Sequence, residues 1–240
     1  MDRKRGFYGR IAAGCVLLLA ALPAAAQWTG KGEAGLAIAD GNSDSRTANA
    51  RITAARKLDA WEHSIGLAGL YVRTEGSTTA RRWEASGQTR FDFLPNTFWY
   101  GGARYEEDRF SGFDHQGLVT TGVGRRFIDN DTTRLIGQVG AGYKFWETLD
   151  VPSDKDSSIT GVASLEFSHQ LTETTSVFDK FGGEFTSDNN FLQNEVGVAV
   201  KMTDRVALSL AYALRHNTDP PPGFRKTDTL TTVNLVYEVK

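Results

Sequence analysis

The sequence is poor in cysteine, with only Cys15 among 240 residues, and it has only six prolines and four histidines. Cys15 lies in an N-terminal segment that we expect to be removed on export, so the mature chain can form no disulfide. This excludes the disulfide-dense scaffolds that are common among small exported domains. An exported chain of this kind must be held together by other means.

Neither sign of charge is in large excess, because 27 basic residues are balanced by 29 acidic ones for a net charge of −2. Residues 1–26 carry four of the basic residues and one acidic residue, so the mature chain has a net charge of −5. Such mild acidity lacks the basic footprint of a nucleic-acid-binding protein. We therefore expect no nucleic-acid partner.

Long apolar runs are also missing, since none of 18 residues follows Gln27, and this excludes a transmembrane helix. The shorter run Ile11–Leu22 follows a basic start and precedes Ala24–Ala26, the layout of a cleaved secretory signal peptide. A lipoprotein signal is disfavoured because a lipid-modified cysteine ends the apolar run, whereas this run continues past Cys15. The sequence predicts a signal peptide at residues 1–26 and one exported domain at residues 27–240.

Alternation of apolar and polar residues runs through the mature chain instead. It is clear in Trp61–Tyr71, Trp83–Phe93, Leu135–Phe145 and Val206–Leu214, which span nine to eleven residues each. Such a period of two predicts strands with one apolar and one polar face. We count about twelve such segments, with no helical period and no linker between them. The sequence therefore predicts a single all-β domain.

These segments exceed the roughly 5–6 residues of ordinary strands and match the roughly 9–11 that cross a bilayer at a tilt. Every second connection is tight, as at Leu58-Asp59 and Thr203-Asp204. The others are mostly longer and more polar: Thr74–Ala80, Glu107–His115, Thr148–Asp156 and Asn217–Arg225. Short turns on one rim and longer loops on the other predict a transmembrane, antiparallel, up-and-down β-barrel of about twelve strands.

Aromatic residues fall in two bands that fit this barrel. Trp61 and Tyr237 belong to a band near the short-turn rim, and Tyr71, Tyr105 and Tyr212 to one near the long-loop rim. Aromatic girdles of this kind mark membrane barrels, although strand propensity alone also enriches aromatic residues. A soluble periplasmic β-sandwich is the competing fold, and it predicts no such bands and extraction without detergent.

Charged residues of both signs share the polar face, which we expect to line the lumen, because a charge facing lipid near the midplane costs about 2–4 kcal/mol. The predicted lumen-lining residues are Glu33, Arg51, Arg82, Glu84, Arg90, Lys144, Glu166, Lys180, Glu184, Glu195 and Lys201. Arg125 and Asp179 are exceptions on the apolar face, both expected near the short-turn rim. The strand at residues 97–106 has aromatics on both faces and cannot be oriented from sequence.

The stretch Ala39–Arg51 places Asp40, Asn42 and Asp44 like the first ligands of an EF-hand calcium loop. That loop requires Gly at its sixth position and Glu at its twelfth, where this chain has Ser45 and Arg51. Small polar residues also favour turns for reasons unrelated to metals. We expect a loop without a metal ion.

The histidines give no clear catalytic site. A nucleophilic site needs a base within hydrogen-bond reach of a serine, and none of His63, His115, His169 and His216 has a serine two residues away. The serines beside His63 and His169 are adjacent in sequence and point to the opposite face. We predict no catalytic residues, no cofactor and no metal; a lipid-modifying enzyme with a cross-strand site is the alternative.

The segment Gly32–Ala50, GEAGLAIADGNSDSRTANA, resembles the start of the salt-induced outer-membrane proteins, domain-of-unknown-function family 481. The resemblance rests on a glycine-rich first strand, the element Gly41-Asn42-Ser43-Asp44-Ser45 and an alternating strand after it. It implies an outer-membrane β-barrel with no assigned catalytic residues. The chain departs from many outer-membrane barrels by ending in Lys240 rather than an aromatic residue, which bears on how the assembly machinery reads its tail.

The function predicted from these features is a non-enzymatic outer-membrane barrel, either a structural envelope component or a narrow passive pore. The resemblance adds a link to salt or osmotic stress. Eight strands give a filled lumen and 16–18 an aqueous one, so about twelve leaves an open and a plugged lumen as alternatives. The expected partners are outer-membrane lipid and, during insertion, the barrel assembly machinery, and the expected state is a monomer.

Overall fold

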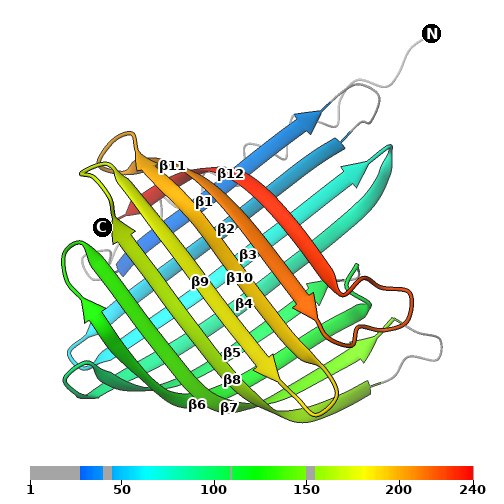
Figure 1. The fold of residues 1–240 in the computed structure, drawn as a ribbon, viewed down its shortest axis with the longest axis horizontal. Coiled ribbons are helices and arrows are strands. Elements are labelled where there is room, and N and C mark those ends of the chain that lie inside the picture. The colour runs from blue at the N-terminus through cyan, green and yellow to red at the C-terminus, as the bar shows by residue number, and fades with distance from the viewer. Residues whose placement is uncertain (1–27, 40–44, 109, 150–154, 240) are drawn as a thin grey trace.

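The computed structural model describes residues 28–39, 45–108, 110–149 and 155–239, and these residues form one closed, tilted β-barrel (Figure 1). Each strand pairs antiparallel with the next, and β12 closes the sheet on β1. The strands are β1 (Trp28–Ala39), β2 (Ser45–Leu58), β3 (Trp61–Thr74), β4 (Ser77–Leu94), β5 (Thr97–Asp108), β6 (Phe113–Asp129), β7 (Thr133–Thr148), β8 (Lys155–Gln170), β9 (Thr175–Phe185), β10 (Asn190–Lys201), β11 (Val206–Asn217) and β12 (Thr227–Val239).

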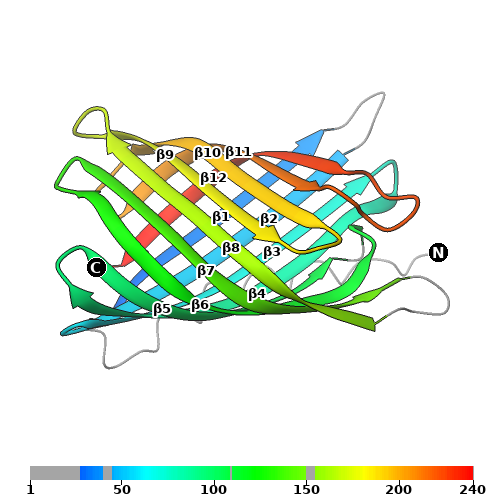
Figure 2. The same cartoon turned by 60° about the horizontal axis from the view of Figure 1, so that its bottom comes forward.

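The fold class predicted from sequence is confirmed: an all-β, antiparallel, up-and-down barrel with twelve strands. The closed sheet makes the sandwich alternative wrong, because a sandwich has two separate sheets with free edges. The strands run from 11 to 18 residues, long enough to cross a bilayer at the tilt seen in Figures 1 and 2. Within the part of the chain that the structure describes, no helix has the length and apolar character to cross a membrane.

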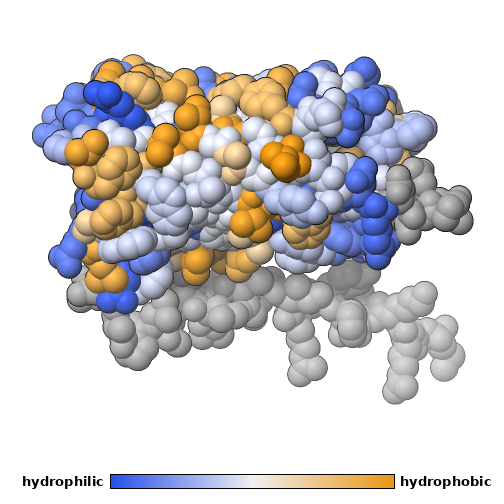
Figure 3. Space-filling view, turned by 90° about the horizontal axis from the view of Figure 1, so that it is seen from below, coloured by the Kyte–Doolittle hydropathy of each residue, from blue (hydrophilic) through white to orange (hydrophobic). Residues whose placement is uncertain are grey.

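The barrel is apolar outside and polar inside, the reverse of a protein folded in water. Ile159 and Leu36 are 78% and 72% exposed on the outer surface, whereas Glu106 and Thr160 are 1% and 0% exposed inside. Figure 3 shows apolar side chains over the side of the barrel, with hydrophilic ones toward its ends. Exposed apolar surface on this scale marks contact with a partner or with lipid.

Two-residue turns make the hairpins tight. On the short-turn rim, Asp59 and Asn96 adopt positive φ angles of 51° and 62° in the β2–β3 and β4–β5 turns. On the opposite rim, Glu75 and Gly76 have φ angles of 49° and 80° and join β3 directly to β4. The prediction of a loop at residues 74–80 is therefore wrong. Two successive positive φ angles close a hairpin with the strand twist intact, so the Ser/Thr-rich residues after Gly76 continue as strand.

A small apolar cluster of Phe98, Tyr100 and Ile136 fills the interior near the short-turn rim. It needs a glycine on the neighbouring strand β6, because a Cβ at Gly124, the register partner of Phe98, would overlap the ring of Phe98. We expect Gly124→Leu to lower the free energy of unfolding by about 1–3 kcal/mol, as overpacking of a filled core does. Equilibrium unfolding in detergent micelles measures this, and an unchanged stability would show that the cluster is loose.

Candidate functional site: a charged constriction inside the barrel

Strand β5 carries two charged residues that project into the lumen. Its side chains alternate, so Trp99 and Tyr105 lie outside, 38% and 36% exposed, while Arg104 and Glu106 point inward with Phe98 and Tyr100. Arg104 and Glu106 contact side chains of strands that are not neighbours of β5. In a closed barrel such contacts are possible only through the interior, so this alternation fixes the orientation that sequence could not.

One ion pair joins strands on opposite sides of the barrel: Glu106 on β5 and Arg215 on β11. Nη2 of Arg215 donates to both carboxylate oxygens of Glu106, at 2.7 and 2.8 Å. Strands β5 and β11 lie diametrically opposite each other in the twelve-strand order, so this one pair spans the lumen. Arg215 also approaches Asp108, at 3.6 Å.

Further charged residues on β5, β7 and β9 belong to the same group. Arg104 donates a short hydrogen bond to Glu184 of β9 and lies 3.4 Å from Glu106. Lys144 of β7 places its ammonium 2.9 Å from the second oxygen of Glu184. The charges thus alternate in sign along the series Lys144, Glu184, Arg104, Glu106 and Arg215, and each carboxylate binds two cations. We call Arg104, Glu106, Lys144, Glu184 and Arg215 the constriction.

Phe191 of β10 supports the three cations of the constriction. The guanidinium of Arg215, the ammonium of Lys144 and the guanidinium of Arg104 lie 4.9, 5.5 and 5.8 Å from the centre of its ring. Phe191 is 4% exposed, so these cation–π contacts form in a largely desolvated place, where they are strongest. The ring therefore fills part of the lumen between these charged groups.

Two looser groups of charges lie elsewhere in the lumen. Arg51 of β2 binds Glu195 of β10 through two hydrogen bonds of 3.1 Å, and Lys180 lies 3.5 Å from the same carboxylate. Closer to the short-turn rim, Arg90 of β4 lies 3.8 Å from Glu166 of β8. The Glu166 side chain is 48% exposed, so that pair is long and solvated compared with the constriction.

The predicted lumen-lining residues fall into three groups. Arg82, Glu84, Arg51, Glu195, Lys180, Arg90, Glu166, Lys144 and Glu184 all take part in ion pairs inside the barrel. Glu33 faces a small cavity and pairs with Lys31 at 2.9 Å. Lys201 lies at the short-turn rim, beside Asn130 and Thr174.

Sequence reasoning missed three members of the constriction: Arg104, Glu106 and Arg215. The first two lie on the strand that could not be oriented. Because Arg104 and Glu106 are two residues apart, the sequence places them on the same face of the strand. It does not show whether that face points into the lumen or toward the lipid. Arg215 follows Ser209, Ala211 and Ala213 on the inward face of β11, a row of small residues that leaves its long side chain room to reach across.

Two adjoining cavities lie beside the constriction. One of about 700 Å³ extends from the short-turn rim, at Thr29 and Glu238, up to Arg104 and Glu184. Its walls are rich in uncharged polar groups, including Gln88 and Gln138, whose amides join across the lumen at 3.2 Å. A second of about 430 Å³ adjoins it and has Arg51, Arg82, Lys180, Glu195 and Arg215 in its wall.

The connection between β11 and β12 lies at the long-loop rim of the barrel (Figures 1 and 2). A Cβ on Gly112, in the β5–β6 connection, would lie 2.9 Å from both Pro221 and Phe224. Those two connections leave the barrel on opposite sides, so residues 218–226 reach across the opening. A cavity of about 250 Å³ below them is lined by Lys144, Phe113 and Pro220–Pro222. This loop therefore lies over part of the opening.

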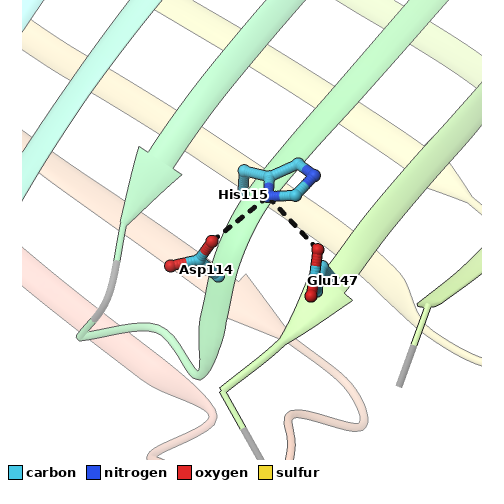
Figure 4. Close-up of side chains that lie close together, drawn as sticks. All are labelled: Asp114, His115 and Glu147. Atoms are coloured by element: carbon cyan, nitrogen blue, oxygen red, sulfur yellow. Dashed lines mark hydrogen bonds and ion pairs between the residues drawn. The ribbon is translucent and has the colours of Figure 1, made fainter. Parts of the chain in front are cut away.

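Among the residues that the structure describes, one cluster of potential metal ligands lies on the outer surface near the long-loop rim (Figure 4). Nδ1 of His115 is 3.4 Å from Asp114 and 3.9 Å from Glu147, and a bulge in β6 turns Asp114 and His115 to the same side. The ammonium of Lys155 lies 3.2 Å from Glu147 and neutralises part of the charge that would attract an ion. The absence of a bound metal stays a prediction from sequence.

The other three histidines each bind a threonine on the neighbouring strand. Nδ1 of His63, His169 and His216 lies 2.9, 2.8 and 2.8 Å from the hydroxyls of Thr89, Thr133 and Thr227. Among the described residues, no hydrogen bond joins a histidine to a serine. Asp40, Asn42 and Asp44 lie outside the described residues, whereas Arg51, the twelfth position of that motif, points into the lumen.

A closed, tilted barrel that is apolar outside and charged inside is a transmembrane β-barrel of the outer-membrane type. The chain belongs to the family of proteins of unknown function DUF481, whose model matches residues 32–239. It is 26% identical over 222 residues to the uncharacterized protein YdiY of Escherichia coli K12, covering 90% of this chain and 86% of that one.

Solved outer-membrane barrels share the fold. The NanC porin matches with a TM-score of 0.55 and 8% identity, over 89% of this chain and all of that one. The COG4313 outer membrane channel from Pseudomonas putida F1 matches with a TM-score of 0.53 and 11% identity, over 91% of this chain and 97% of that one. At such low identity the likeness shows the architecture alone.

Proposed function

We propose that this protein is a non-enzymatic outer-membrane barrel that forms a narrow passive pore, closed at rest by the constriction. The observation that carries this proposal is the Arg215–Glu106 pair, which crosses the lumen in a constriction between a cavity of about 700 Å³, lined by Arg104 and Glu184, and one of about 250 Å³, lined by Lys144. A solute entering from the short-turn side therefore meets a wide polar vestibule and then a gate made of side chains. The likeness of its fold to a porin and a channel supports the proposal.

The chemistry of the constriction favours a gate over a permanent plug. Buried ion pairs are a poor way to stabilise a core, since apolar residues of similar volume are often as stabilising or more so. Charged side chains on separate strands can instead part and rehydrate without unfolding any strand. A structural envelope component is the second candidate, and it is favoured by the loop at residues 218–226, which approaches the β5–β6 connection on the far side of the mouth.

We propose that the link to salt acts through charged groups of the lumen outside the constriction. The Arg51–Glu195 pair is partly solvated, with Arg51 38% exposed, and mobile ions can screen it. The Debye length falls from about 10 Å at 0.1 M salt to about 3 Å at 1 M. We propose that high ionic strength weakens such partly solvated ion pairs of the lumen before those of the constriction and thereby favours the open lumen.

Swelling of proteoliposomes in sugars of graded size tests the pore. We expect wild-type protein to admit even small sugars slowly at 0.1 M salt and faster at 1 M. Arg104→Ser/Arg215→Ser should swell much faster, because two of the three cations that close the lumen are gone. The matched control Arg56→Ser/Arg125→Ser removes two arginines from the outer face near the short-turn rim and should behave as wild type.

Equal, slow swelling of all three proteins would favour the structural barrel. Rapid swelling of wild type at low salt would show that the lumen is open at rest. Release of fatty acid from the liposomes by purified wild-type protein would contradict the non-enzymatic proposal and revive the lipid-modifying enzyme.

A further inference from the structure

Two exposed arginines face each other on the outer surface of the barrel at the long-loop rim. Arg46 of β2 and Arg73 of β3 are direct partners in the sheet register, and both side chains are exposed. Arg81 of β4 extends the group, because it is the register partner of Tyr71, two residues before Arg73. Its side chain is 56% exposed. We call Arg46, Arg73 and Arg81 the arginine patch.

The arginine patch has an excess of positive charge that the described residues do not neutralise. Like charges directly opposite each other on neighbouring strands destabilise a sheet. Within the described ranges, neither Arg46 nor Arg73 has a carboxylate within 4.0 Å; Arg73 donates from Nε to the carbonyl of Gly76 at 2.8 Å. Arg81 reaches Glu107 only at 3.9 Å. An anion from outside the chain would relieve this repulsion.

The position of the patch along the strands selects the kind of anion. Tyr71 and Trp83 form the aromatic band at this rim, 40% and 44% exposed, and Arg73 and Arg81 each lie two residues beyond one of them. Two residues of a strand tilted by roughly 45° rise about 5 Å. The headgroup layer of a bilayer is about 5–7 Å thick on each side, so the guanidinium groups fall at its depth.

We infer that the arginine patch binds the phosphate groups of a phosphorylated lipid in the leaflet at the long-loop rim. In outer-membrane barrels that rim faces the cell exterior, where the leaflet contains phosphorylated glycolipid. Guanidinium groups bind phosphate through paired hydrogen bonds. Exposed Ile52, Leu67 and Tyr71 lie below the patch on the same strands and offer the acyl chains an apolar surface. The inference needs the membrane barrel but not the closed lumen.

Native mass spectrometry of the detergent-solubilised barrel tests this with two probes of equal acyl content, lipid A bearing two phosphates and the same lipid after enzymatic dephosphorylation. We expect wild type to bind the phosphorylated lipid at least tenfold more tightly. Arg46→Gln/Arg73→Gln should lose about 20-fold in affinity for it, as two surface cations near an anionic headgroup predict. Arg46→Lys/Arg73→Lys keeps the charge and should fall between the two.

Arg56→Gln/Arg125→Gln is the matched control, because it removes two outward arginines near the short-turn rim and should change the affinity less than twofold. Heat-modifiable gel migration establishes that each variant has formed the barrel. The inference is overturned if both lipids bind wild type equally, as they would if the patch served a protein partner. An equal loss in the control, or displacement of the lipid by millimolar inorganic phosphate, would also overturn it.

Discussion

Replacing Glu106 by glutamine is expected to lower the free energy of unfolding by about 3–5 kcal/mol, the cost of removing one partner from a buried ion pair. Glu106 is 1% exposed and holds Arg215 at 2.7 Å and Arg104 at 3.4 Å. Glutamine keeps the shape of the side chain and removes its charge, so two buried guanidinium groups lose their shared counter-ion. Urea unfolding of the folded barrel in micelles, followed by tryptophan fluorescence, measures the change.

Glu166→Gln is the matched control for this prediction. It makes the same chemical change in the same lumen, but the Glu166 carboxylate is 48% exposed and lies 3.8 Å from Arg90. Solvated pairs contribute about 0–1 kcal/mol, so this variant should unfold nearly as wild type does. If the two variants lose equal stability, the constriction is no drier than the rest of the lumen, and its role as the gate is wrong.

Placing an arginine at Val139 is expected to destabilise the barrel by about 2–4 kcal/mol, although Val139 is 60% exposed. Val139 lies near the middle of β7 on the apolar outer face, where we expect the centre of the bilayer. In a protein folded in water, a surface substitution of this kind changes stability by less than about 0.5 kcal/mol. The sign and size of the effect therefore distinguish lipid from water as the surroundings of this face.

The control for Val139→Arg is Met202→Arg. Met202 is 64% exposed but lies in the β10–β11 turn on the short-turn rim, where a charge costs only about 0–1 kcal/mol. Refolding of both variants into bilayers of dimyristoyl lipid, with heat-modifiable migration as the readout of the folded fraction, compares them. Equal tolerance of both arginines would contradict a membrane-spanning barrel.

The barrel was predictable from sequence because a period of two over about ten residues leaves few alternatives. One apolar face repeated in about twelve strands has to be buried, and lipid around a closed sheet buries all of them at once. The β3–β4 connection was predicted wrongly because its Ser/Thr-rich residues look like a loop. Only the Glu75-Gly76 dipeptide, which can adopt two positive φ angles, carried the signal for a tight turn.

The constriction was less accessible to sequence reasoning. Strand β5 has Phe98 and Tyr100 on one face and Trp99 and Tyr105 on the other, so hydrophobicity does not orient it. Phe98 fits inside because Gly124 on β6 leaves room for its ring. Which charges pair depends on how the tilted sheet closes, and this brings Arg215 to Glu106 over a separation of 109 residues. A list of inward residues does not determine such pairs.

Single-channel recording in a planar lipid bilayer tests the closed lumen most directly. At 0.1 M salt and low voltage, wild-type protein is expected to be silent apart from rare brief openings. Arg104→Ser/Arg215→Ser, inserted from the same detergent at the same concentration, should show frequent, long-lived openings of uniform size. Steady conductance from the wild type, equal to that of the variant, would contradict the account, because it would mean that Arg104 and Arg215 do not close the path.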